Sequence, residues 1–184
     1  MLTKALEFAK KAHEGQTRKS GGPYIEHPIE VAELIKRAGL PEEYIVAGYL
    51  HDILEDTSIT PYEIAKHFGE EVLRIVNVNT ENKRQSWLVR KTKTHQQIPH
   101  LTLNERIFIV ADKLSNLRSI EKGLAQDPHF FDKFNASYEY QRWYYTSIAL
   151  LLPLNLVQDE KLPAIFAEYE NLVFKVFPPS IQNG

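Results

Sequence analysis

Residues 48–56 bring an imidazole and several carboxylates close together in the sequence. Read as a helix, at about 100° per residue, this segment puts apolar side chains on one broad side and His51, Asp52 and Glu55 on the other, with Asp56 at the edge. Gly48, one turn before Asp52, leaves a notch through which a compact cation or a ligand could approach the backbone. The alternative interpretation is a solvated acidic helix flank, because most charge clusters are of that kind.

A second polar group lies further along the chain, inside an apolar helix. Residues 102–105 form a capping box that predicts a helix running to about residue 121. Asp112, Asn116 and Ser119 follow one another at i, i+4 and i+7, as a narrow polar stripe enclosed by apolar side chains. A buried carboxylate needs a partner, which is either a metal ion or a cation such as Lys113.

His27 completes a possible ligand set. It precedes Pro28, which suits the first turn of a helix expected to end near residue 38. A single histidine there is most often a cap or a surface residue, but His27, His51, Asp52 and Asp112 together supply two imidazoles and two carboxylates from three helices. This ratio suits Mn²⁺, Fe²⁺, Mg²⁺ or Zn²⁺ with positions left open for water and substrate, whereas a closed structural zinc site would use cysteine. The chain contains no cysteine.

Two basic segments could receive an anion. Residues 15–24 contain three glycines, a proline and the adjacent pair Arg18-Lys19, so backbone amides and two cations can approach one ligand, although a mobile surface loop fits equally well. Residues 83–103 contain no acidic residue and five cations, among them Lys83 and Lys91. Such a run is usually a solvated face, and the alternative is a basic wall for a polyphosphate.

The whole chain predicts one all-α domain. Its 184 residues are 43% hydrophobic and 25% charged, which allows a substantial core, and the net charge of −2 gives no general reason to bind nucleic acid or an acidic membrane. No segment shows the alternation of a sheet, and no apolar run is long enough to span a bilayer, so we expect a cytoplasmic protein. The helices are expected at about 3–14, 28–38, 41–57, 61–68, 70–78, 102–121, from 128 onward, 134–152 and 163–176.

Taken together, the motifs resemble a known family. The residues His27, His51-Asp52 and Asp112 match the H…HD…D pattern of the HD-domain metal-dependent phosphohydrolases. More narrowly, the chain resembles the hydrolase domain of the RelA/SpoT homologues, including the single-domain small alarmone hydrolases. The resemblance is carried by Gly15-Gln16-Thr17-Arg18-Lys19, Pro23-Tyr24-Ile25-Glu26-His27-Pro28, His51-Asp52-Ile53-Leu54-Glu55-Asp56-Thr57 and Ala111-Asp112-Lys113-Leu114-Ser115-Asn116-Leu117-Arg118.

The resemblance implies a fold, a reaction and a set of roles. It implies one helical HD hydrolase domain over residues 1–184, with its motif core at about 13–120 and the helices of residues 128–176 packed on it. It implies removal of the 3′-pyrophosphate from guanosine tetra- or pentaphosphate, giving GDP or GTP. The implied metal ligands for one Mn²⁺ are His27, His51, Asp52 and Asp112, the catalytic acids are Glu55 and Asp56, and the substrate-binding residues are Arg18, Lys19, Asn116 and Ser119, with Lys83 and Lys91 of the basic run neutralising substrate charge.

The chain departs from the family at a few positions, and other functions stay open. It reads Thr80-Glu81-Asn82-Lys83 where the small hydrolases tend to have one more carboxylate, and Ser115 where an aromatic residue or histidine is common. The alternatives are a phosphatase or pyrophosphatase for another nucleotide and a nucleotide-sensing module without turnover. A nucleic-acid binder is the least expected class, and the sequence makes no prediction of oligomeric state.

Overall fold

The computed structural model describes residues 1–156 and 161–179, and within them the chain is helical without a named strand. An isolated antiparallel bridge joins Thr17 to Pro23 in the loop after the first helix. The expectation of an all-α fold is therefore confirmed. None of the helices in these two ranges combines the length and the apolar character needed to cross a bilayer.

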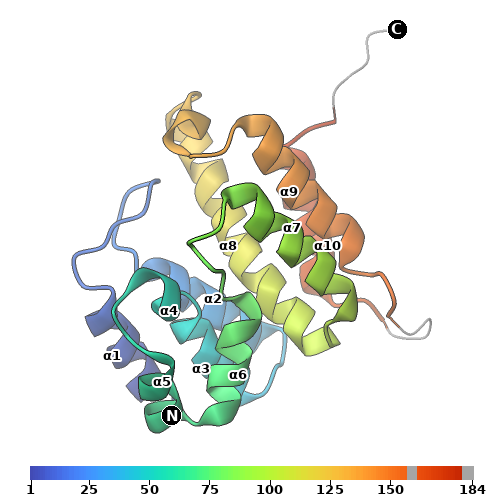
Figure 1. Cartoon of the computed structure of the whole chain (residues 1–184). Helices are drawn as coiled ribbons and strands as arrows, with labels where there is room; N and C mark the ends of the chain where they lie inside the picture. The colour runs from blue at the N-terminus through green and yellow to red at the C-terminus, as the bar shows by residue number, and fades with distance from the viewer. Residues whose placement is uncertain (157–160, 180–184) are drawn as a thin grey trace, which may run out of the picture.

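The elements follow the chain in a simple order (Figure 1). The first part consists of α1 (Leu2–Ala12), α2 (Glu26–Arg37), α3 (Glu42–Leu50), α4 (Ile53–Asp56), α5 (Pro61–Phe68) and α6 (Glu70–Asn79). The second part consists of α7 (Trp87–Gln97), η1 (Ile98–His100), α8 (Leu103–Gln126), η2 (Phe130–Lys133), α9 (Tyr138–Leu151) and α10 (Ala164–Val176).

Helix α8 is the centre of the fold. It packs against α2 and α6 on one side and α10 on the other, so both parts of the chain share one core (Figure 1). Its residues from Glu105 to Ser115 are all buried, including Asp112 and Lys113. Asp112 of the predicted polar stripe thus lies inside the protein, where its oxygens need partners, whereas Asn116 and Ser119 are only partly buried.

Local signals account for where several helices begin. Thr102 forms the predicted capping box at the start of α8, and Thr60 forms another at the start of α5. Pro163 precedes α10 as expected. Helix α7 was not predicted as a helix, and its start is capped by Ser86, whose hydroxyl accepts a hydrogen bond from the Val89 N–H.

The helix predicted over residues 41–57 is wrong in one respect, because it is interrupted. Helix α3 ends at Leu50, and α4 starts again at Ile53. His51 Nδ1 lies 2.9 Å from the Gly48 carbonyl, which in a continuous helix would accept from the N–H of residue 52. The imidazole takes that carbonyl instead, and the chain turns at the two residues that the sequence marks for chemistry.

The notch expected at Gly48 is also a misinterpretation. A Cβ atom at this position would lie 2.8 Å from Ile35 Cδ1 and 3.0 Å from Ala32 Cα, so the missing side chain lets α3 approach α2 closely. The glycine serves helix packing rather than ligand access. A further helix was expected from residue 128, but the chain there forms only the short η2.

Candidate metal centre and nucleotide cavity

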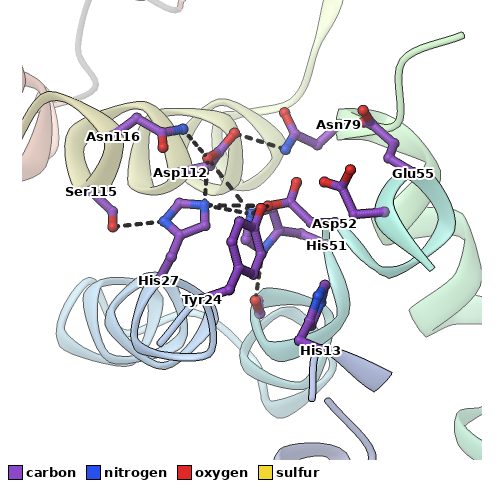
Figure 2. Close-up of polar contacts among 12 residues, drawn as sticks. His13, Tyr24, His27, His51, Asp52, Glu55, Asn79, Asp112, Ser115 and Asn116 are labelled. Atoms are coloured by element: carbon purple, nitrogen blue, oxygen red, sulfur yellow. Dashed lines mark hydrogen bonds and ion pairs between the residues drawn. The ribbon is translucent and has the colours of Figure 1, made fainter. Parts of the chain in front are cut away.

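Three helical segments bring the four predicted ligands together (Figure 2). His27 comes from α2, His51 and Asp52 from the break between α3 and α4, and Asp112 from α8. The Nε2 atoms of His27 and His51 are 3.1 Å apart. Asp52 Oδ2 lies 3.4 and 3.0 Å from these two nitrogens, and Asp112 Oδ1 lies 3.2 and 3.6 Å from them.

In each histidine ring, the hydrogen bond made by Nδ1 determines whether Nε2, which faces the cluster, carries a lone pair or a proton. His51 Nδ1 contacts the Gly48 carbonyl, which only accepts, so this nitrogen carries the proton. His27 Nδ1 lies 2.8 Å from Ser115 Oγ, and Ser115 donates its own proton to Glu30 Oε2 at 2.7 Å, so His27 is again the donor. In the neutral rings both Nε2 lone pairs therefore face each other beside two carboxylate oxygens.

This donor set fits a divalent cation. One ligand atom from each of His27, His51 and Asp112 lies within 4.8 Å of the other two, and all three residues are buried. Two lone pairs and two anionic oxygens repel one another unless a cation lies among them, and the outer hydrogen bonds hold the rings in the orientation that metal-binding histidines use.

The titration behaviour reflects the same crowding of charge. Burial opposes ionisation of Asp52 and Asp112, but the neighbouring cationic groups, first His51 for Asp52 and first Lys113 for Asp112, hold both pKa values well below the usual range. Burial likewise lowers the pKa of His51, yet Asp52 and Asp112 raise it well above the ordinary value. In the protein without a cation, a proton on His51 therefore offsets part of the carboxylate charge.

Asp112 is held by three further groups. Lys113 Nζ and Asn79 Nδ2 lie 2.6 and 2.9 Å from Oδ2, and Asn116 Nδ2 lies 2.7 Å from Oδ1. Lys113 was expected as a possible partner from the sequence, whereas Asn79 was not. A signal for it existed, because Asn79 continues the buried register of Val72, Ile75 and Val76 on α6.

Asp52 has a partner in Tyr24, a residue of the motif at residues 23–28 for which no contact was predicted. The Tyr24 hydroxyl donates to Asp52 Oδ2 at 2.5 Å. Burial and the charge of Asp52 raise the pKa of Tyr24 far above its ordinary value, so the hydroxyl stays protonated.

The two predicted catalytic acids lie in different environments. Glu55 is 10% exposed and accepts a hydrogen bond from the Glu81 N–H at 2.8 Å. Burial raises its pKa to about 7, although that hydrogen bond acts in the opposite direction. Asp56 is 33% exposed and forms an ion pair with Lys83, whose Nζ lies 3.8 Å from Glu55 Oε2.

A cavity of about 290 Å³ adjoins the ligand cluster. Tyr24 and Asn116 belong to both, since each lines the cavity and binds a carboxylate of the cluster. The other lining residues are Thr17, Arg18, Lys19, Ser119, Ile120, Phe130, Phe134 and Tyr145. The cavity thus combines two cations with an aromatic and apolar wall.

Contacts among these side chains hold the cations at the cavity. Arg18 donates to Asn116 Oδ1 at 3.0 Å and to Ser119 Oγ at 3.4 Å. Lys19 Nζ lies 4.4 Å from the centre of the Phe134 ring, and burial lowers its pKa. Four of the predicted substrate-binding residues, Arg18, Lys19, Asn116 and Ser119, are therefore together here.

The basic run after residue 82 is used differently. Lys91 and Arg90 both form ion pairs with Glu81, at 2.7 and 2.6 Å, and Lys83 pairs with Asp56. Lys91 also lies 4.8 Å from the centre of the Tyr144 ring and does not line the cavity. These three cations hold the carboxylates around Glu55 rather than forming a free basic wall.

Comparisons with known proteins place these features in context. The HD domain family profile matches residues 5–131. Guanosine-3′,5′-bis(diphosphate) 3′-pyrophosphohydrolase MESH1 of Mus musculus is 34% identical over 171 residues, which cover 91% of this chain and 93% of the relative. The enzyme of the same name from Homo sapiens is 39% identical over 125 residues, covering 66% and 70%.

Solved structures agree on the fold. The crystal structure of lmo0812 from Listeria monocytogenes EGD-e superimposes with a TM-score of 0.78 at 41% identity, over 86% of this chain and 98% of that one. A metazoan ortholog of SpoT, described as hydrolysing ppGpp, gives a TM-score of 0.77 at 22% identity, over 95% and 93% of the two chains.

Proposed function

The chain belongs to the HD domain family, and from this premise we propose that it is a metal-dependent guanosine-3′,5′-bis(diphosphate) 3′-pyrophosphohydrolase. The reaction adds water to the 3′-pyrophosphate of ppGpp or pppGpp, breaks the bond between phosphorus and the ribose 3′ oxygen, and releases GDP or GTP with pyrophosphate. Relatives of this name match 91% and 66% of the chain, and the HD family profile matches residues 5–131.

One observation carries the proposal: the convergence of two imidazole Nε2 atoms and two carboxylate oxygens next to a cavity that offers cations and aromatic rings. We assign His27, His51, Asp52 and Asp112 as ligands of one divalent ion, with Mn²⁺ as the expected metal. When bound, such an ion acidifies a water molecule and polarises a phosphoryl oxygen.

Glu55 is the group best suited to take a proton from the attacking water. Its carboxylate is fixed by the Glu81 N–H and lies one turn beyond His51 and Asp52. A pKa of about 7 makes it a stronger base than an ordinary glutamate while leaving it ionised in much of the protein near neutral pH.

The ion pair between Asp56 and Lys83 could stabilise the negative charge that develops on the leaving ribose 3′ oxygen. Asp56, the second implied catalytic acid, could deliver a proton to the leaving oxygen, but its carboxylate is paired with the Lys83 ammonium. We propose that the pair acts together, with Lys83 supplying positive charge near the ribose 3′ oxygen and Asp56 holding the lysine in place. Lys91 contributes indirectly: it forms an ion pair with Glu81, and the Glu81 N–H donates a hydrogen bond to the Glu55 carboxylate.

The cavity of about 290 Å³ beside the ligand cluster is proposed to bind the nucleoside part of the substrate. Arg18, fixed by Asn116 and Ser119, presents a planar cation that can stack on a purine base, and Phe130 and Phe134 supply an aromatic wall. Lys19 adds positive charge at the rim. A single hydrolase domain over residues 1–184 and a cytoplasmic location complete the proposal.

The test is a substrate panel with the purified protein and Mn²⁺. We expect turnover of ppGpp and pppGpp to GDP or GTP plus pyrophosphate, with much slower reaction of GTP, ATP and a dinucleotide that carries a 2′-phosphate. Chelation should abolish turnover, and metal analysis should find one ion per chain. Preference for a 5′-nucleotide or a 2′-phosphate would replace the proposal with another phosphatase activity, and tight nucleotide binding without turnover would indicate a sensing module.

A further inference from the structure

Tyr24 is the side chain that physically joins the ligand cluster to the cavity. Its hydroxyl donates to Asp52 Oδ2, and that same oxygen lies 3.0 and 3.4 Å from the two imidazole nitrogens. Its ring lines the cavity and lies 5.9 Å from the Arg18 guanidinium. One side chain therefore touches a proposed metal ligand and a proposed nucleotide-binding residue.

The orientation of Asp52 depends on this hydroxyl. Asp52 lies at the break between α3 and α4 with φ −96° and ψ −4°, so no regular helix continues through it to hold its side chain. Asp112 accepts hydrogen bonds from Lys113, Asn79 and Asn116. Apart from the two histidines, the one side chain among residues 1–156 and 161–179 that donates to the Asp52 carboxylate is Tyr24. Partners of this kind set the direction and basicity of a metal-binding carboxylate.

The ring of Tyr24 is also held by a chain of contacts from residues 13 and 16. The imidazole of His13 packs against it with ring centres 4.8 Å apart, and His13 Nδ1 lies 2.9 Å from Gln16 Oε1. Gln16 Nε2 in turn donates to the Asp56 carbonyl at 2.9 Å, and the Gln16 carbonyl accepts from the Tyr24 N–H at 2.9 Å. Tyr24 is thus held by the end of α1 and by the loop that carries Arg18.

We propose that Tyr24 is a positioning residue with two separable parts: its hydroxyl orients Asp52 for the metal ion, and its ring forms a wall of the nucleotide cavity. The inference rests on the proposed function for the nature of the nucleotide, but its metal-binding part does not depend on the substrate. The two parts predict different defects for two substitutions at this residue.

The first experiment is titration of the metal-free full chain with Mn²⁺ alone, followed by calorimetry. Tyr24→Phe removes the hydroxyl and keeps the ring, and we expect Mn²⁺ binding about 10- to 100-fold weaker than in the unsubstituted protein. The matched control is Tyr169→Phe on α10, because the Tyr169 hydroxyl also donates a hydrogen bond, to the Tyr145 carbonyl at 3.0 Å and away from the cluster. Tyr169 is fully buried and Tyr24 is half-buried, so the control tests loss of a tyrosine hydroxyl at a site where packing matters at least as much. This control should leave the Mn²⁺ affinity unchanged.

The second experiment measures ppGpp hydrolysis over a range of Mn²⁺ concentrations. For Tyr24→Phe we expect kcat to fall at low Mn²⁺ and to recover at high Mn²⁺, with an unchanged KM for the nucleotide. Tyr24→Leu, which also removes the ring, should show the same weakened Mn²⁺ binding and, in addition, a raised KM that Mn²⁺ does not restore.

Unchanged Mn²⁺ affinity in Tyr24→Phe would overturn the proposal, and so would an equal loss in Tyr24→Phe and Tyr169→Phe, because the defect would then be a general loss of packing. An unchanged KM in Tyr24→Leu would overturn the part assigned to the ring. Failure of the unsubstituted protein to hydrolyse ppGpp would count against the proposed function alone, since the calorimetric result contains no nucleotide.

Discussion

The ionisation of Glu55 is expected to control how the reaction rate depends on pH. Burial raises its pKa to about 7, and a base acts only in its ionised form, so the rate should increase as pH rises through the pKa of this group. A divalent ion bound nearby favours the carboxylate and moves this limb to lower pH. We therefore expect kcat/KM to rise with pH along a limb centred at or below about 7.

The matched substitution is Glu55→Gln, which keeps the size of the side chain and removes its charge. We expect a rate about 10²- to 10⁴-fold lower and loss of the acidic limb. The carboxyl resonance of Glu55, followed by NMR in the metal-free protein, should titrate near pH 7. A limb that persists unchanged in Glu55→Gln would show that another group controls it.

The same residue affects stability, with a defined sign. Because the pKa is raised in the folded protein from an ordinary value of 4.5, protonated Glu55 favours the folded state. Its contribution is complete below about pH 4.5 and is lost as pH rises through about 7. Denaturant titrations of the metal-free protein should show this loss, and those of Glu55→Gln should not.

At the scale of elements, the contact between α2 and α3 places both histidines. Gly48 allows the close approach, and its carbonyl also accepts from His51. Gly48→Ala should therefore lower stability by about 1–3 kcal/mol through overpacking against Ala32 and Ile35, despite the better helix propensity of alanine. It should also weaken Mn²⁺ binding, because the carbonyl that orients His51 moves with the helix.

Val46→Ala serves as the comparison for this prediction. Val46 is fully buried on the same helix, and its truncation lowers stability without pushing α3 away from α2. Denaturation curves and Mn²⁺ titrations of both variants separate the two effects. If Val46→Ala weakens Mn²⁺ binding as much as Gly48→Ala does, the close approach at Gly48 has no special importance for the site.

The contact between α8 and η2 shapes the cavity in a similar way. A Cβ atom on Gly123 would lie 2.5 Å from the ring of Phe130, which lines the cavity. Gly123→Ala should displace that ring, lower stability by about 1–3 kcal/mol and raise the KM for ppGpp about tenfold. The double variant Gly123→Ala with Phe130→Leu should regain stability but keep the raised KM, and recovery of both would place Phe130 outside the binding surface.

At the scale of the whole molecule, a bound ion links segments that lie far apart in the chain. His27, His51, Asp52 and Asp112 come from α2, the α3–α4 break and α8, so the complete ligand set exists only in the folded protein. At an Mn²⁺ concentration about 100 times the Kd, this linkage contributes about 2.7 kcal/mol, which corresponds to a rise in Tm of about 5–10 °C for a chain of this size.

Differential scanning calorimetry with Mn²⁺ and with a chelator measures this shift. His51→Gln should lose it, whereas His95→Gln, on α7 and bound to the Tyr144 carbonyl, should keep it. An equal shift in both variants would place the stabilising ion at another site.

The sequence by itself determined the class of fold and the identity of the residues that meet. Capping boxes at Thr60 and Thr102 and the apolar periodicity of α8 are local properties, so they could be predicted from neighbouring residues. The spacing of Asp112, Asn116 and Ser119 on one helix face is local in the same sense.

Only the tertiary structure decided how these residues are held. The break at His51, the protonated Nδ1 atoms that turn both Nε2 atoms inward, and the pairing of Lys91 with Glu81 all depend on partners from other helices or on the competition for one carbonyl. Tyr24 and Asn79 each act on a carboxylate that lies 28 or 33 residues away in the chain. The local register indicates that Asn79 is buried, but neither pairing can be read from neighbouring residues, because both contacts arise only when the helices pack.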